Sequence, residues 1–300
     1  MVKLVSSRTA RLYAPGGYRE LLEGINGFIY VLGAVLILAG LIFQLPSHEN
    51  SKLGLILALT GSILIFLVNL HDLYAHLAGV DFKLELLKVD PQYILVEIAV
   101  PVVTALGSFL VFLGLLFLLL TAKGRYSHHT RNTLAVHGLR MLIAGPALWL
   151  LASIHNIFQL YERASLGVQA YERGVTVCFV IASTLLLCGG VIGLPYWPKT
   201  VERRLQSNAT WFAILGAALL VLGGIVNLMR ISTLQRLERE GPGHGGEFLR
   251  GGAQESLNRM RGESGEPFLE GSAKHREDVE GGEGRSLYKD VVAGSPERLY

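Results

Sequence analysis

The fold of this chain is decided by a stretch that reads VLGAVLILAGLIF over residues 31–43. It contains no charged residue, and its two glycines, Gly33 and Gly40, stand seven positions apart. Seven residues make nearly two turns of an α-helix, so both glycines fall on one helix face, where they let a neighbouring backbone approach closely. The stretch therefore predicts a membrane-spanning helix that packs along its glycine face.

The same seven-residue spacing of small residues recurs twice further along the chain. Gly107 and Gly114 repeat the spacing and are followed by Leu-Leu-Phe, and Ala182 and Gly189 keep a version of it. In the second, fourth and sixth apolar stretches, a glycine lies ten residues before the polar end of the stretch. These glycines are Gly61 before His71, Gly145 before His155, and Gly216 before Val226-Asn227. This internal repeat predicts three tandem helical hairpins with parallel orientation, related by an axis along the membrane normal.

Six apolar stretches are long enough to cross a bilayer, for which roughly 20 residues are needed. The chain is 51% hydrophobic and only 17% charged, and most of its charge lies before Gly24 or after Met229. Backbone groups in lipid must pair internally, which favours helices, and these stretches lack the polar stripe of a soluble helix. We predict an all-α membrane protein with six transmembrane helices, at about 27–45, 53–76, 93–121, 134–160, 174–194 and 209–230.

The ends of the chain differ in composition from this transmembrane domain, which we place at 25–233. Residues 1–24 form a polar N-terminal segment, and residues 234–300 are rich in Gly, Glu, Arg and Ser. Such a composition buries too little surface to offset the entropy of ordering, so we expect a mostly disordered tail. Lys and Arg near the spans are more numerous on the N-terminal side, which predicts that both termini are cytoplasmic. We expect the plasma membrane or an endomembrane rather than an organelle.

Polar residues inside spans are costly and are the first place to look for function. The predicted topology brings nine of them into one layer near one membrane interface: Asn69, His71, Asp72, Glu97, His155, Asn156, Gln159, Asn227 and Arg230. Three interpretations stay open. The layer holds helices together through hydrogen bonds; it relays protons or cations in a transporter; or His71 and His155 are paired axial ligands of a b-type haem.

Other classes of function find little support in the sequence. A net charge of +3 gives no basic field for nucleic acid. No catalytic signature is present, and His71 and His76, five residues apart, do not share a helix face as a metal pair would. We therefore expect a non-enzymatic protein without a bound metal or cofactor. A scaffold or accessory membrane protein with a cytosolic partner for its tail ranks first, ahead of a transporter. The small-residue helix faces also permit a homo-oligomer.

Three motifs resemble plant multi-pass membrane proteins of unassigned function. They are the N-terminal run from Arg8 to Glu20, the end Asn69-Leu70-His71-Asp72-Leu73, and Ser153-Ile154-His155-Asn156. The resemblance covers residues 1 to about 235 and implies a land-plant origin. It carries no activity over to any position of this chain.

Overall fold

The computed structural model describes residues 16–45, 51–81, 98–122, 127–157, 166–194 and 199–239. All of them belong to the first of two units into which the chain divides, 1–254, and the second is 255–300. The predicted disordered tail therefore lies outside the described residues, as do Glu97 and Gln159.

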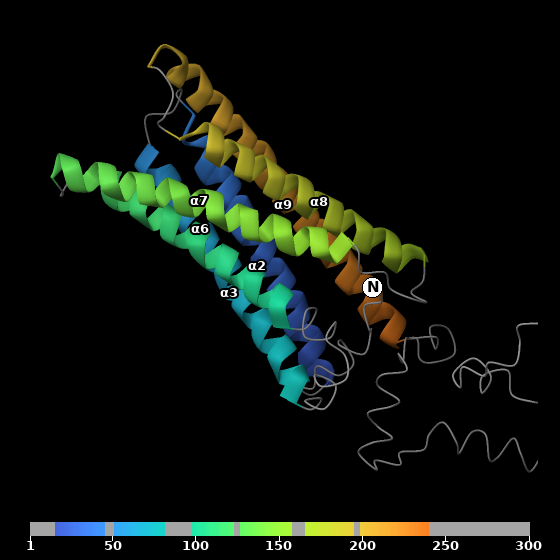
Figure 1. The fold of residues 1–300 in the computed structure, drawn as a ribbon. Helices are drawn as coiled ribbons and strands as arrows, with labels where there is room; N and C mark the ends of the chain where they lie inside the picture. Colours follow the sequence, from blue (N-terminus) through green and yellow to red (C-terminus); the bar gives the residue numbers. More distant parts are fainter. Residues whose placement is uncertain are drawn as a thin grey trace, which may run out of the picture. The chain divides into compact units, whose positions relative to one another are not determined.

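The described residues form six α-helices, and all six are long and apolar enough to cross a membrane. This confirms the prediction of an all-helical, six-span membrane protein. The helices, coloured along the chain in Figure 1, are α2 (Gly16–Ile42), α3 (Ser51–Asp81), α6 (Val100–Ala122), α7 (His128–Ile157), α8 (Leu166–Ile192) and α9 (Lys199–Arg239).

Several helices extend beyond the predicted spans because hydropathy marks only their apolar parts. α7 begins at His128, six residues before the expected span, since Ser127 caps it: its Oγ accepts a hydrogen bond from the backbone N–H of Thr130 at 3.3 Å. α8 begins at Leu166, so Glu172, which the sequence places in a connection, lies inside a helix. This shift brings a charged side chain into the bundle.

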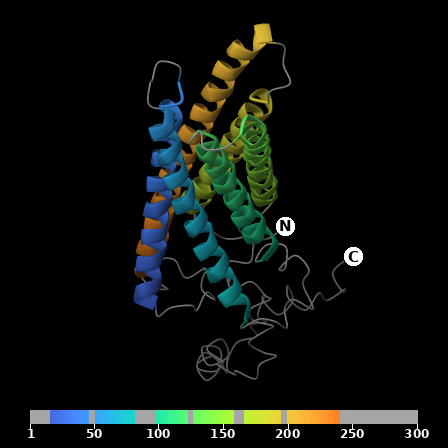
Figure 2. The same cartoon turned by 90° about the vertical axis from the view of Figure 1, so that its left-hand side faces the viewer.

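The six helices form a ring in which each packs against its neighbours in the chain. The most extensive contacts lie within three hairpins, α2–α3, α6–α7 and α8–α9, which we call hairpins 1, 2 and 3. Smaller contacts join α3 to α6 and α7 to α8, and α9 returns to α2, which closes the ring. Figures 1 and 2 show the pairs running side by side from two directions. The order of contacts is that of three equivalent units around an axis.

Inside each hairpin the two backbones meet at two pairs of small residues. A Cβ added to Gly40 would lie 2.5 Å from the carbonyl oxygen of Gly54, and one added to Gly107 would lie 2.9 Å from that of Gly145. Contacts this short essentially never occur for real Cβ atoms, so the packing at these two positions needs glycine. The pairs occupy the same repeat positions: Gly33 with Gly61 and Gly40 with Gly54, Gly107 with Gly145 and Gly114 with Gly138, Ala182 with Gly216 and Gly189 with Ala209.

The centre of the ring is filled by apolar side chains from all six helices. Three buried side chains occupy one repeat position, four residues after Gly61, Gly145 and Gly216 respectively. They are Ile65, Trp149 and Leu220. They belong to one connected cluster: Ala34, Ile37, Ala58, Ile65, Val111, Leu115, Trp149, Ala182, Ala217 and Leu220. Large apolar side chains such as Phe28, Leu67 and Leu151 point outwards and are exposed, as contact with lipid requires.

A proline inside α7 is accommodated by the neighbouring hairpin. Pro146 has no N–H to donate to the carbonyl of Leu142, four residues earlier. Gly190 of α8 packs at this carbonyl, with its Cβ position 3.4 Å from the Leu142 oxygen. Neighbouring helices commonly cover backbone groups that proline leaves free in a membrane. Hairpins 2 and 3 are therefore in close contact at this point.

Candidate functional site at the polar end of the bundle

One group of polar side chains lies towards the end of the bundle where α2, α6 and α8 begin and α3, α7 and α9 end. We call this the polar end. It includes seven of the nine residues that the sequence assigns to a single layer: Asn69, His71, Asp72, His155, Asn156, Asn227 and Arg230. Glu97 and Gln159 lie outside the described residues. The contacts of the others, and of neighbours that the sequence did not indicate, show what this end can do.

Asn69 takes part in a hydrogen-bonded cluster that joins three helices. Its Nδ2 donates to Ser108 Oγ at 2.5 Å, linking α3 to α6. Trp149 of α7 donates from Nε1 to the same Ser108 Oγ at 3.1 Å and to the carbonyl of Thr104 at 3.2 Å. Ser108 is only 1% exposed, and its own hydroxyl donates to the Thr104 carbonyl at 2.9 Å. The cluster ties hairpin 1 to hairpin 2.

We expect Ser108→Ala to lower the free energy of unfolding by about 2 kcal/mol, because it removes the acceptor of the Asn69 amide and leaves the Trp149 N–H with the Thr104 carbonyl alone. Denaturant titration in detergent micelles measures the loss. Ser62→Ala is a matched control, since Ser62 is also buried and donates only to the Leu59 carbonyl of its own helix. Equal losses for the two variants would contradict a linking role for Ser108.

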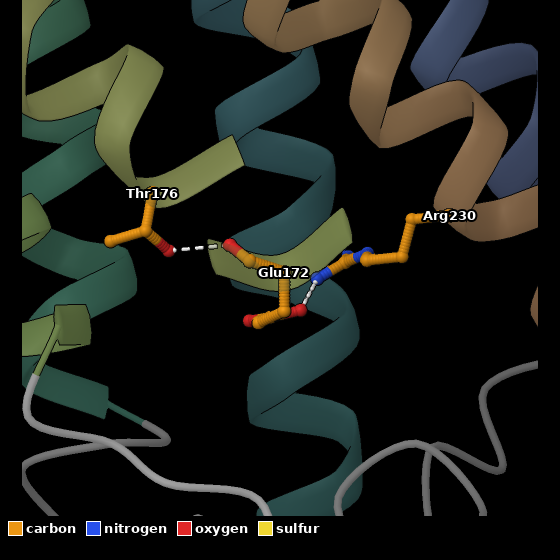
Figure 3. A network of polar contacts seen from close by, with 3 residues as sticks. All are labelled: Glu172, Thr176 and Arg230. Carbon is orange, nitrogen blue, oxygen red and sulfur yellow. Dashed lines mark hydrogen bonds and ion pairs between the residues drawn. The ribbon is translucent and has the colours of Figure 1, made fainter. Parts of the chain in front are cut away.

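A second polar contact joins the two helices of hairpin 3. Figure 3 shows the Glu172 carboxylate of α8 pointing at the guanidinium of Arg230 on α9, where Arg230 Nη1 donates a hydrogen bond to Glu172 Oε2. Thr176 donates from Oγ1 to the Glu172 backbone carbonyl at 2.9 Å, within α8. The side chains are 19% and 25% exposed, so the charges are largely withdrawn from solvent. Such a pair is charge-assisted and directional.

The histidines of the polar end occupy different surroundings. His71 on α3 and His155 on α7 are half-buried, and α6 lies between these two helices in the ring. His76 is buried on α3, with its Nε2 3.7 Å from Asp72 Oδ2 one turn earlier, while Asp72 itself is half exposed at 51%. Among the described residues, no three His, Cys, Asp or Glu side chains gather closely enough to hold a metal ion. The haem interpretation stays a prediction.

Asn156 and Asn227 complete the predicted layer. Both are half-buried. Asn156 lies eleven residues after Gly145, and Asn227 lies eleven residues after Gly216. Asp72 holds the same repeat position in hairpin 1, so the three units each place one polar side chain there. The shared position follows from the internal repeat.

Three residues of this end were missed by reasoning from sequence. Ser108 and Trp149 lie within apolar stretches where a serine or tryptophan gives no functional signal of its own. Glu172 was assigned to a connection because the apolar run begins two residues later. A signal was available, because Glu172 lies one helical turn before Thr176, so a span extended by one turn includes the carboxylate.

No protein-family model, curated protein or solved structure matches this chain. The resemblance to plant membrane proteins stays a prediction. Chemically, the polar end offers neutral hydrogen bonds between hairpins 1 and 2 and one ion pair within hairpin 3. These contacts fix helix positions, and they pair the Glu172 carboxylate with the Arg230 guanidinium at this end of the bundle.

Proposed function

We propose that this integral membrane protein is a scaffold or accessory protein, in which the six-helix ring is a rigid platform and the tail beyond residue 240 binds a cytosolic partner. Both termini face the cytosol in this proposal, as the distribution of Lys and Arg indicates. The ring anchors the tail at the membrane, and the polar end faces the side from which the tail leaves.

The observation that supports this proposal most is the way the bundle is closed. Each hairpin is held at two backbone contacts, and one apolar cluster fills the space between all six helices. Interfaces of this kind are close-packed and resist gradual deformation. The Asn69 cluster adds hydrogen bonds between hairpins. An arrangement stabilised at so many points suits a fixed platform better than a carrier that must alternate between two shapes.

The alternative is a proton or cation transporter that uses the polar end. The observation that favours it is the pair of Glu172 and Arg230, since ionisable groups within spans often mark ion pathways. His155 is half-buried at the same end and is a suitable proton carrier.

A flux measurement in proteoliposomes separates the two candidates. We expect wild-type protein to give the same proton flux as protein-free vesicles under an imposed potential, read with an enclosed pH-sensitive dye. Flux above that level, abolished by His155→Ala at an equal reconstituted amount, would overturn the scaffold proposal in favour of transport. An absorption spectrum of the same preparation tests the haem alternative, because two histidine ligands give an intense Soret band.

The tail is tested by comparing the full chain with one that ends at Arg239. We expect both to fold alike by circular dichroism, while cytosolic proteins crosslinked to the full chain in cells are lost from the shortened one. A full-length chain whose residues 241–300 are shuffled is the matched control, and it should lose them too. Retention of the same proteins by the shortened chain would contradict the proposed role of the tail.

A further inference from the structure

A basic pair lies on the outer surface of the bundle, away from the polar end. Arg140 and His137 of α7 are both exposed and stand three residues apart, which makes them neighbours on one helix face. In the part of the chain that the structure describes, no acidic side chain pairs with either. Charged residues in spans usually face the interior of the helix bundle. An arginine on the outer surface therefore needs a partner that does not belong to the bundle.

The internal repeat shows how unusual this position is. Gly138 packs on Gly114 as Gly54 packs on Gly40 in hairpin 1. Arg140, two residues after Gly138, therefore holds the position that Ile56 occupies in hairpin 1 and Trp211 in hairpin 3. Both of those residues are exposed and apolar, as lipid contact requires. Hairpin 2 alone places a cation at this position.

The depth of the pair follows from the same comparison. Arg140 lies six residues, about 9 Å, inside the span predicted to begin at residue 134, although α7 itself begins at His128. The equivalent Ile56 lies five residues, about 7.5 Å, after the start of α3 at Ser51. A side chain as long as arginine reaches a headgroup from that depth by extending towards the interface. Along the same face of α7, towards the membrane centre, follow Ala144 and Leu151, which are exposed and uncharged. The face therefore offers a cation at the interface and a hydrocarbon surface below it.

We propose that Arg140 and His137 bind the phosphate of a phospholipid headgroup, whose acyl chain lies along the face of Ala144 and Leu151. The amphipathic pattern of the face matches a phospholipid in both charge and polarity. The guanidinium donates two parallel hydrogen bonds to the phosphate oxygens, and the imidazole of His137 donates a third. Basic pockets between transmembrane helices hold anionic lipid headgroups by the same attraction between cation and phosphate.

The test uses the full chain, purified in detergent and mixed with phosphatidylglycerol, with bound lipid counted by native mass spectrometry. We expect Arg140→Leu to lower the occupancy of the most tightly held lipid roughly tenfold, the loss expected for charge-assisted hydrogen bonds. His137→Leu should lower it by a smaller factor. Leucine at 140 resembles the apolar residues of the other hairpins, so the variant should fold, which its melting curve without lipid checks.

Arg131→Leu is the matched control, because Arg131 is also exposed on α7 but lies nine residues earlier, on the opposite side of the helix. It should leave the lipid occupancy unchanged. The proposal is overturned if Arg140→Leu keeps the wild-type occupancy, or if both variants lose lipid equally. It is also overturned if Arg140→Leu dissociates an oligomer instead, since the partner would then be an acidic residue of a second copy.

Discussion

Gly40→Leu should prevent hairpin 1 from packing and lower the free energy of unfolding by about 3 kcal/mol, the upper end of the cost of overpacking. The added Cβ alone would lie 2.5 Å from the Gly54 carbonyl oxygen and 2.6 Å from the Ala58 amide nitrogen. Both are backbone atoms, which cannot turn aside as a side-chain end can. The helices must therefore separate, and separation exposes the buried face of α2.

Unfolding of the variant in mixed micelles, followed by circular dichroism, measures this loss. Gly24→Leu is the matched control, because it makes the same change in the same helix where nothing lies within 4 Å of the Cβ position. Its free energy of unfolding should stay level or rise by up to about 1 kcal/mol, since leucine favours a helix more than glycine does. If Gly40→Leu unfolds at the same denaturant concentration as Gly24→Leu, the close contact is unimportant.

Glu172→Gln and Arg230→Gln should each lower the free energy of unfolding by about 3 kcal/mol. Each leaves its former partner as an uncompensated charge in a largely buried site, which costs more than the pair itself contributes. The double variant Glu172→Leu with Arg230→Met removes both charges. It should lose less than either single variant, because two apolar side chains of similar size pack there without an unpaired charge.

A cycle of the wild type, Glu172→Gln, Arg230→Gln and the double variant that combines these two changes measures the coupling between the two side chains. Losses that simply add would show that Glu172 and Arg230 act independently, and the assigned contact would be wrong. Arg173→Gln serves as a control for charge removal, because Arg173 is the exposed neighbour of Glu172 on α8. It should change stability by less than about 0.5 kcal/mol.

The sequence predicted the six spans and their pairing into hairpins because both depend on patterns local to the chain. Long apolar stretches indicate spans, and glycines spaced by seven residues indicate close helix faces. It did not indicate Gly54, Gly138 and Ala209, the partners of those glycines. Each lies seven residues before the glycine of the second helix that the sequence did indicate, and its contact across the antiparallel hairpin shows that it is a packing position.

Which polar residues meet was decided by tertiary structure alone. Asn69 and Ser108 are 39 residues apart, and Glu172 and Arg230 are 58 apart, so no local spacing relates them. Closure of the ring by α9 and α2 likewise joins the two ends of the repeat. The sequence by itself determined that this protein lies in a membrane as repeated helices, because hydropathy and small-residue spacing act within one helix. The partners of its polar side chains were fixed only by the packing of helices distant in the chain, because hydrogen bonds require positions in space that no single helix determines.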